Sequence, residues 1–485
     1  MTTKNLTYDK VDITGGFWQE KQQLIRDVTI WNVYKRFEET GRFAAFKMNW
    51  KEGMPNKPHI FWDSDVAKWL ESAAYLTKKQ RDPKLEAIVD EVVDDIERGR
   101  WEDGYFNIYF ELFEPQNRFT KRGWHELYCA GHLIEAAVAY AEATGKDKFL
   151  HLMMDYADLI KKIFMDEQSA AFDSPGHEEI ELALVKLYDY THEERYLELA
   201  RFFIDKRGSQ AKLPEGDNYH RGTNIQDHLP VREQFTAEGH SVRACYLYSA
   251  MADLALRDND VSLKFAAEKI FDNITNAKMY ITGAVGSTHI AEAFEEEYRL
   301  PNDTAYAETC AALALALFAR RMEKLEVDSR YADTVERVIY NGFLSGLSLD
   351  GKSFFYENAQ EIDLEERRIV KEAVRDTSYI HYPITQRLEV FNCSCCPPNV
   401  TRFIASIGDF IYNYDDETIY VNQYMDSTAK LGELTLVQKT DYPFDGRIEF
   451  TLTGGDRKVA LRIPGWCRVW SVGKNGASVD AHIEH

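Results

Sequence analysis

The sequence has no long hydrophobic segment and no excess of positive charge. No stretch of its 485 residues approaches the ~18 apolar residues of a membrane-spanning helix, and the N-terminal MTTKNLTYDK lacks the apolar core of a secretory signal. The chain carries 58 Lys and Arg against 80 Asp and Glu, a net charge of −22. Nucleic acids and anionic membranes are bound by basic patches. We therefore exclude both as main partners and predict a cytoplasmic protein.

Cysteine is also scarce, with seven residues in the whole chain, yet three of them fall within FNCSCCPPN (391–399). In a reducing compartment, clustered cysteines serve metal binding or catalysis more often than disulfides. The adjacent Cys395 and Cys396 are too strained to pair readily with each other. We expect Pro397 and Pro398 to impose an extended exit, so that the loop can direct both sulfurs to one metal ion.

Helical periodicity extends to about residue 410. In ESAAYLTKKQRDPKLEAIVDEVVDDIERG, apolar residues recur at steps of three and four. AYAETCAALALALFARRMEK is apolar on all sides, which predicts an inner, buried helix. Asn302, Asp303 and Thr304 offer N-caps in front of it.

A weak internal repeat indicates how these helices are arranged. Three segments begin with Gly-His, run into a helix and turn into another one: GHLIEAAVAYAEATGKDKFL, GHEEIELALVKLYDYTHEERYL and GHSVRACYLYSAMADLALRDND. Stacked helical hairpins of this kind form a closed toroid or an open solenoid. Either arrangement places His132, His177 and His240 at equivalent helix starts, and a toroid brings such starts to one rim.

After residue 410 the pattern changes to short β-branched strands. ETIYVNQYM, ELTLVQKTDYP, RIEFTLTG and KVALRIPGW are punctuated by Gly-Gly and Pro-Gly. We predict a helical domain over 15–410 and a β-sandwich domain over 411–485, which an N-terminal strand within 1–14 could join. Four or five strands leave an open edge, so we expect this second domain to be incomplete.

Two further segments supply donors for chemistry. A tetrahedral site needs more than two thiolates, and Glu308 and Cys310 in AYAETCA are the candidates. Residues at i and i+2 do not share a face of a regular helix, so both can bind one ion only where the helix is distorted or has not begun. Glu292, in GSTHIAEAFEEEYRLPNDT, is a candidate proton donor, whereas we interpret the run 295–297 as a solvated surface.

Five motifs in this order resemble glycoside hydrolase family 127, the bacterial β-L-arabinofuranosidases: HELYCAGHLIEAAVAY, LPNDTAYAETCA, ERVIYNG, FFYEN and CCPPNVTR. The resemblance extends from VDITGGFW to LRIPGW. It implies a mainly α fold, with an (α/α)6 barrel catalytic domain followed by a partial or short β-sandwich domain. It also implies an exo-acting, retaining hydrolase that releases β-L-arabinofuranose from arabino-oligosaccharides or glycoconjugates. Family members usually continue past LRIPGW, so a homodimer built through that region is disfavoured here.

The resemblance assigns roles by motif. Cys395 matches the nucleophile and Glu292 the general acid/base. Zn²⁺ is the implied cofactor, and its ligands match Glu308, Cys310, Cys395 and Cys396. Sugar-lining positions match His132, His177, His240, Glu336 and Tyr356. Cys393 has no assigned role.

Two alternatives remain open on the sequence. The same scaffold could act on a different L-sugar or a branched sugar acid, because one barrel hosts many activities. A non-catalytic carbohydrate-binding protein with a structural zinc site is an interpretation of another class, since a closed four-ligand site is typical of structural zinc.

Overall fold

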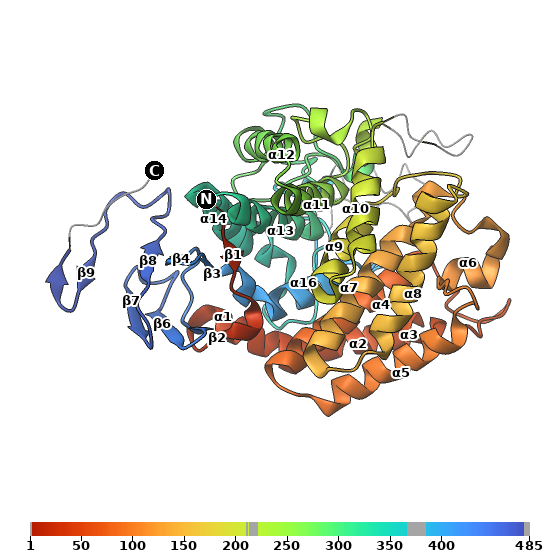
Figure 1. Cartoon of the computed structure of the whole chain (residues 1–485), viewed down its shortest axis with the longest axis horizontal. Coiled ribbons are helices and arrows are strands. Elements are labelled where there is room, and N and C mark those ends of the chain that lie inside the picture. The colour runs from red at the N-terminus through yellow and green to blue at the C-terminus, as the bar shows by residue number, and fades with distance from the viewer. Residues whose placement is uncertain (1, 210–211, 213–221, 366–384, 480–485) are drawn as a thin grey trace.

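The computed structural model describes residues 2–209, 212, 222–365 and 385–479. The remaining parts of the predicted helical domain, 210–211, 213–221 and 366–384, lie outside the described residues. So do 480–485 at the end of the predicted β domain. Figure 1 shows a large helical body with a smaller group of strands beside it.

Six helices of the described chain form a closed inner ring. Each packs against the next, and the last packs against the first. In ring order they are α4 (Trp62–Lys79), α7 (Glu126–Thr144), α9 (Ile180–Thr191), α11 (Ser241–Asp258), α13 (Thr309–Leu325) and α16 (Cys396–Ala405). Their side chains are buried almost all round, as expected for helices enclosed by others. The ring confirms the predicted (α/α)6 barrel and the closed form of the helical repeat.

An outer layer of helices connects these inner helices. Its members are α1 (Gly16–Leu24), α2 (Ile30–Glu39), α5 (Pro83–Gly99), α8 (Lys148–Lys161), α10 (Glu194–Lys206), α12 (Val261–Asn273) and α14 (Ser329–Arg337), with the short α3 (Arg42–Ala45) and α6 (Ile108–Phe113) in connections. Each outer helix returns the chain before the next inner helix begins. All inner helices therefore run in the same direction, and their N-termini meet at one rim.

The N-terminal capping of three outer helices differs from that of two inner helices at the cysteine cluster. The outer helices α5, α12 and α14 begin after Asp82, Asp260 and Asp328, whose carboxylates accept hydrogen bonds from backbone N–H groups of the first turn. Three inner helices instead have His240, Glu308 and Cys395 at their N-caps. Glu308 and Cys395 make no side-chain capping bond, so both side chains are available for other contacts.

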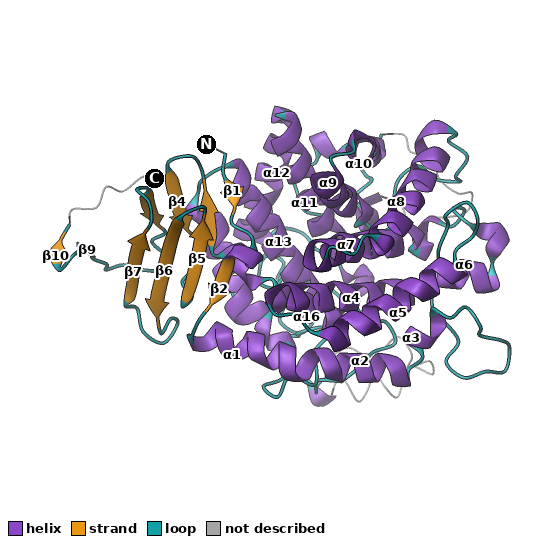
Figure 2. Ribbon diagram, turned by 60° about the horizontal axis from the view of Figure 1, so that its bottom comes forward, coloured by secondary structure: helices purple, strands orange, loops and turns teal. Residues whose placement is uncertain are grey.

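Two four-stranded sheets lie beside the barrel (Figure 2). The first has the order β1 (Lys4–Asn5), β3 (Tyr412–Tyr414), β4 (Thr418–Val421) and β8 (Lys458–Leu461), with β4 and β8 parallel. The second has the order β2 (Val11–Ile13), β5 (Ser427–Leu431), β6 (Leu434–Thr440) and β7 (Ile448–Thr453). The hairpin β9 (Gly473–Lys474) and β10 (Ala477–Ser478) stands apart. The four strands predicted from the sequence are β4, β6, β7 and β8.

The N-terminus belongs to both sheets. Lys4 of β1 lies opposite Tyr414, and Val11 of β2 lies opposite Ala429. The chain thus enters the molecule through the strand region before it forms the barrel.

Two local expectations were wrong. The buried helix α13 begins at Thr309, so its N-cap is Glu308 and not one of residues 302–304. His132 lies inside α7, whereas His240 is the N-cap of α11 and His177 precedes α9. The Gly-His repeat therefore does not place all three imidazoles at equivalent positions, because α7 begins earlier relative to its Gly-His pair.

Candidate active site

Four predicted ligands meet where α13 and α16 begin. The carboxylate of Glu308 and the sulfurs of Cys310, Cys395 and Cys396 all lie within 4.8 Å of one another, and all four residues are buried. The Cys310 sulfur is 3.2 Å from that of Cys396 and 3.6 Å from that of Cys395. Two helix N-termini point into this cluster, which favours negative charge there.

Most distances between these atoms are close to those of a tetrahedral zinc site, while the 3.2 Å between the Cys310 and Cys396 sulfurs is shorter. With Zn–S bonds of ~2.3 Å and tetrahedral angles, ligand sulfurs lie about 3.8 Å apart. The sulfurs of Cys395 and Cys396 are 3.8 Å apart, and Oε1 of Glu308 is 3.7 Å from the Cys395 sulfur. The second oxygen of Glu308 is buried and accepts no hydrogen bond within the described ranges. A cation would give this oxygen a partner.

Without a cation, the four acids compete for charge. Burial, and then the charge of Cys395, raises the pKa of Glu308 well above its usual range. Burial also raises the pKa of the Cys310 thiol, but its hydrogen bonds with Cys395 and Cys396 outweigh this effect and bring the value to about 6. Burial and the hydrogen bond with Cys310 both raise the pKa of Cys396. Full deprotonation of the cluster therefore requires added positive charge.

The backbone at Glu308 explains how residues two apart reach one point. Glu308 is extended, with φ −61° and ψ 136°, and α13 becomes regular only after it. Glu308 also pairs with Glu357 in an antiparallel bridge. The spacing problem raised by the sequence is solved because Glu308 precedes the regular helix.

The two prolines differ from their expected role. Pro397 and Pro398 lie in the first turn of α16, where a missing N–H costs no helical hydrogen bond. They start a helix and do not form an extended exit. The expectation failed because proline is tolerated in the first turn of a helix, where its fixed φ already suits the helix, as well as in an extended segment. Cys395 already has helical angles, φ −65° and ψ −39°.

Glu292 is held by an unusual backbone conformation. Ala291 and Glu292 have φ values of 55° and 56°, a left-handed region that is costly for residues other than glycine. The Oε2 atom of Glu292 lies 2.6 Å from Nε2 of His240, and the Glu292 side chain is 34% exposed. Burial raises the pKa of Glu292, but the charge and hydrogen bond of the neighbouring His240 lower it by more. The net pKa therefore lies below the ordinary value.

This carboxylate and the cysteine cluster share a neighbour. Donor atoms of His240, Glu292 and Glu308 lie within 4.8 Å of one another, and Glu308 also belongs to the cluster. A partly exposed acid and a buried set of thiols therefore meet at one rim of the barrel.

Aromatic and imidazole groups line the same region. The Tyr356 hydroxyl is 3.2 Å from the Cys395 sulfur. The ring of His177 lies 5.5 Å from that of His240 and 4.2 Å from that of Tyr128. His132 is fully buried, with Nδ1 3.0 Å from Glu179. Burial lowers the pKa of His132 and His177 well below the ordinary value, so both are neutral at pH 7.

Glu336 is not brought to this group. It belongs to the outer helix α14 and forms an ion pair with Arg462, and Trp466 donates to it at 2.7 Å. Its partners thus come from the strand region and its C-terminal connection. The prediction that Glu336 lines the sugar site is not supported, because its carboxylate is occupied there.

Some residues at the site carried no signal in the sequence. The buried Tyr306 lies near Glu292, and the buried Asn399 lies near Cys310. Both lie within quoted motifs, Tyr306 in LPNDTAYAETCA and Asn399 in CCPPNVTR. Each of them is far along the chain from the group that it approaches. The motifs alone therefore did not predict that these groups meet in the fold.

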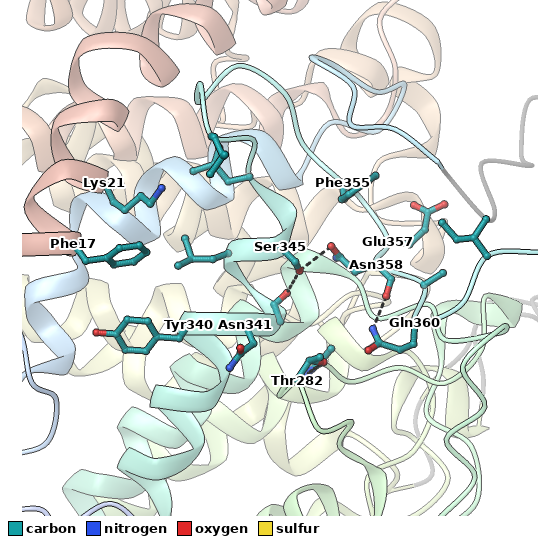
Figure 3. A pocket seen from close by; sticks show the side chains of 17 residues that line it. Phe17, Lys21, Thr282, Tyr340, Asn341, Ser345, Phe355, Glu357, Asn358 and Gln360 are labelled. Atoms are coloured by element: carbon teal, nitrogen blue, oxygen red, sulfur yellow. Dashed lines mark hydrogen bonds between the residues drawn. The ribbon is translucent and has the colours of Figure 1, made fainter. Parts of the chain in front are cut away.

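A separate cavity of about 630 Å³ adjoins the segment that carries Tyr356 (Figure 3). Phe355 and Glu357 line it, whereas Tyr356 between them reaches the thiols. Neighbouring residues of an extended segment point to opposite sides. None of the ten predicted site residues lines this cavity, so the groups that carry chemistry lie outside it.

Among the described residues, no helix combines the length and apolarity that crossing a membrane requires.

Two family models together match nearly the whole chain. Residues 10–409 match the model for the β-L-arabinofuranosidase GH127 catalytic domain, and residues 418–485 match the model for the GH127 middle domain. A curated relative, the non-reducing end β-L-arabinofuranosidase of Bifidobacterium longum subsp. longum, is 39% identical over 436 residues, which cover 84% of this chain. The chain spans 65% of the length of that relative.

Solved structures show the same similarity. A GH127 β-L-arabinofuranosidase from Geobacillus stearothermophilus T6 is 41% identical, with a TM-score of 0.89 over 97% of this chain and 77% of that one. A second GH127 β-arabinofuranosidase is 35% identical, with a TM-score of 0.88 over 99% of this chain and 77% of that one.

Proposed function

The chain belongs to glycoside hydrolase family 127, and from this premise we propose that the protein is an exo-acting β-L-arabinofuranosidase with retention of configuration. Its substrates are arabino-oligosaccharides or glycoconjugates that end in β-L-arabinofuranose. The observation that carries the proposal is the meeting of Glu292 and the cysteine cluster through their shared neighbour Glu308. The activity named for the relatives supports the choice of sugar.

We propose that Glu308, Cys310, Cys395 and Cys396 hold Zn²⁺. When bound, the ion supplies the positive charge that keeps these thiols deprotonated. Two observations support this assignment. The sulfurs of Cys395 and Cys396 are 3.8 Å apart, and one buried oxygen of Glu308 accepts no hydrogen bond within the described ranges. We also propose that the barrel over 15–410 forms the catalytic unit and that 411–485, joined by 1–14, forms a second unit. The cytoplasmic location stays a prediction.

The chain's own residues then perform a double displacement. The Cys395 thiolate attacks the anomeric carbon while the protonated form of Glu292, a minority at neutral pH because His240 lowers its pKa, gives its proton to the leaving oxygen, so an S–C bond forms as the C–O bond breaks. Glu292, now ionised, takes a proton from water, and the water oxygen attacks the same carbon. The S–C bond breaks, the thiolate is restored, and two inversions give retention.

Neighbouring groups prepare the sugar and the carboxylate for these steps. His240 lies 2.6 Å from Glu292 and fixes the orientation of its carboxylate. The neutral imidazole of His177 can hydrogen-bond to sugar hydroxyls, and the Tyr356 hydroxyl lies beside the attacking sulfur. His132, fully buried beside Glu179, supports this wall from within the barrel.

The proposal is tested by hydrolysis of a panel of aryl furanosides and pyranosides, with and without verified metal removal. We expect fastest release from the β-L-arabinofuranoside, loss of activity in the apo-protein and recovery with Zn²⁺. NMR should show the β-anomer of the free sugar first. Full activity after metal removal would disprove the metal assignment, and initial release of the α-anomer would disprove retention. Sugar binding without hydrolysis by the metal-loaded protein would favour the non-catalytic interpretation.

A further inference from the structure

The cavity outside the thiol cluster has the size of a ligand site. Its volume of about 630 Å³ lies within the range of ~300–1,000 Å³ that is common for small-molecule pockets. Its walls come from four separate parts of the chain: Phe17 of α1, Thr282 in a turn, Tyr340 after α14, and residues of the segment 355–362. The fold therefore builds this cavity from segments that are far apart in the sequence.

One wall carries a buried carboxyl group. Glu357 lines the cavity and is 3% exposed. Within the described part of the chain, no residue donates a hydrogen bond to its carboxyl oxygens or forms an ion pair with it. Glu126, which is 2% exposed, instead accepts hydrogen bonds from the Tyr105 hydroxyl at 2.6 Å and from the Phe119 backbone at 2.9 Å. Because buried polar groups in proteins are nearly always hydrogen-bonded, Glu357 indicates a ligand that brings donors.

Two amide oxygens add acceptors to the same cavity. The amide nitrogen of Gln360 donates to the backbone oxygen of Asn358 at 2.8 Å, and that of Asn341 donates to the backbone oxygen of Arg337 at 2.9 Å. The oxygen end of each amide therefore keeps its capacity to accept. Both residues line the cavity together with Glu357 (Figure 3). Three acceptor groups fit a ligand with several O–H donors, whereas an anion or a hydrocarbon chain would leave them unpaired.

Aromatic rings supply an apolar surface across from these acceptors. In Figure 3, Phe17 and Tyr340 lie on the side of the cavity away from Glu357. Their ring centroids are 5.8 Å apart, and the Tyr340 hydroxyl accepts a hydrogen bond from Trp18 at 2.9 Å, which orients the ring. Lys21, with its ammonium 5.2 Å from the centre of the Phe17 ring, adds a donor. An apolar face beside hydrogen-bonding groups matches a sugar ring, which has C–H faces and hydroxyl edges.

We propose that this cavity is a second, non-catalytic binding site for a sugar unit, with Glu357, Asn341 and Gln360 accepting hydrogen bonds from its hydroxyl groups. The choice of L-arabinose as the sugar rests on the proposed function, whereas the preference for a hydroxyl-rich ligand does not. Tyr356 reaches the thiols from the same segment, so the two sites share one wall. A second site holds an oligosaccharide at the enzyme and raises the effective concentration of its other end.

The test counts and assigns the binding sites for L-arabinose on the full-length protein. Calorimetric titration gives the affinities, and a crystal structure of the complex shows which groups contact the sugar. We expect one site at Glu357 and another at Glu292. Glu357→Ala should weaken binding at the first site at least about tenfold, the loss typical of a hydrogen bond to a charged group, and leave the second site unchanged.

Glu361→Ala is the matched control, because Glu361 lies on the same segment but is exposed and does not line the cavity. It should bind L-arabinose at both sites as the unaltered protein does. The two variants should have similar urea midpoints, since no group of the described chain pairs with the carboxyl that Glu357→Ala removes. If Glu357→Ala does not fold, Gln360→Ala is measured in its place and should weaken the same site.

Absence of the sugar from the cavity would overturn the proposal, and so would equal affinities in Glu357→Ala and Glu361→Ala. Sugar seen in the crystal without a matching site in the titration would be binding at crystal concentration only, which also counts against it. Neither measurement involves hydrolysis. L-Arabinose bound at Glu357 but not at Glu292 would contradict the proposed glycosidase and support the second site, whereas L-arabinose at Glu292 alone would do the reverse.

Discussion

The cysteine cluster at the rim and the charged network along the barrel axis are both built from buried ionisable groups, but they balance charge differently. In the network, Arg402 lies between the carboxylates of Glu71 and Glu135, at 2.6 and 2.8 Å. In the cluster, Glu308 and the three thiols contact one another and Tyr356. Isolated buried charge is costly. The network is therefore neutralised by the chain itself, whereas the cluster needs a cation from outside.

The two regions also use different parts of the inner helices. Glu71, Glu135 and Arg402 lie within the helices α4, α7 and α16, and their side chains are at most 11% exposed. Glu308 and Cys395 are N-caps at the ends of the helices. The ends are open to a ligand while the interiors hold the ring together. The comparison predicts that changes in the cluster affect turnover and changes in the network affect folding.

The largest expected effect is on the cluster side, with Cys395→Ser. A serine hydroxyl stays protonated at neutral pH and is a weak nucleophile, so kcat should fall by at least about 10³-fold. Steady-state hydrolysis of an aryl β-L-arabinofuranoside measures this, together with metal content and the urea midpoint. The control is Cys393→Ser in the same loop, which should retain activity within about tenfold. Near-normal turnover by Cys395→Ser with Zn²⁺ bound would show that another group attacks.

Glu292→Gln tests whether the cluster is sufficient without its proton donor. Loss of a general acid/base typically costs about 10²- to 10⁴-fold, and less for leaving groups of low pKa that need no proton. Rates should therefore depend more steeply on leaving-group pKa in the variant than in the unaltered enzyme. Glu295→Gln, on the same loop and paired with Arg299 at 2.9 Å, is the control. If the rates of Glu292→Gln and of the unaltered enzyme depended equally on leaving-group pKa, Glu292 would not be the general acid.

On the network side, Arg402→Met leaves two carboxylates without their shared partner. Breaking a buried ion pair on one side costs about 3–5 kcal/mol of unfolding free energy. Lys186 pairs with the same two carboxylates, at 2.9 Å from Glu71 and 3.6 Å from Glu135. Lys186→Met should cost less unfolding free energy, because Lys186 is 26% exposed against 8% for Arg402 and water can solvate the carboxylates that lose it. Urea unfolding of the two metal-loaded variants gives the comparison. The opposite order would mean that exposure does not govern the network.

The sequence predicted the cluster better than the network, for physical reasons. Cys395 and Cys396 are adjacent, so local spacing already indicates a common metal ion for them. The spacing of Glu308 and Cys310 spoke against a shared ion on a regular helix, and it was the family resemblance that placed them at the same site. The helical period likewise predicted α13 as an inner helix, and β-branched runs predicted β4 and β6. In contrast, Glu71 and Arg402 are separated by more than 300 residues and meet only because the ring closes.

Two features of the site escaped sequence reasoning because they depend on backbone conformation. Nothing in the letters of GSTHIAEAF predicts left-handed angles at Ala291 and Glu292, which tertiary contacts impose. Pro397 and Pro398 are compatible with a loop and with a first helical turn, and the packing of α16 in the ring decides between them. Glu336 illustrates the opposite case. Its motif matches that of the family, but in the fold its carboxylate pairs with Arg462.

The smallest expected effect concerns Glu135 of the network and its neighbour Glu179, which both approach Nδ1 of His132, at 3.7 and 3.0 Å. Burial, and then the charge of Glu135, raises the pKa of Glu179 well above its usual range, so Glu179 stays protonated when folded. Burial also raises the pKa of Glu135, but Lys186 and Arg402 outweigh it and the net pKa lies well below the usual range. Folding therefore binds a proton at Glu179 above the unfolded pKa of ~4.3, whereas it releases one at Glu135 only at pH values near and below that pKa.

The two variants should thus shift stability in opposite directions, and they should do so over different pH ranges. Above pH ~4.3 the unfolded chain loses the Glu179 proton while the folded protein keeps it, so stability falls by up to about 1.4 kcal/mol per pH unit through this group. Glu179→Gln escapes that loss and should gain stability relative to the unaltered protein between pH 5 and 7. Glu135→Gln lacks the stabilising carboxylate that is fully present above the unfolded pKa, so its deficit should persist over that range and shrink only at lower pH. Urea unfolding at pH 4, 5, 6 and 7 measures both. If Glu135→Gln, and not Glu179→Gln, gained stability over the unaltered protein between pH 5 and 7, the buried proton would lie on Glu135. Glu179 would then be the ionised carboxylate that Arg402 and Lys186 stabilise.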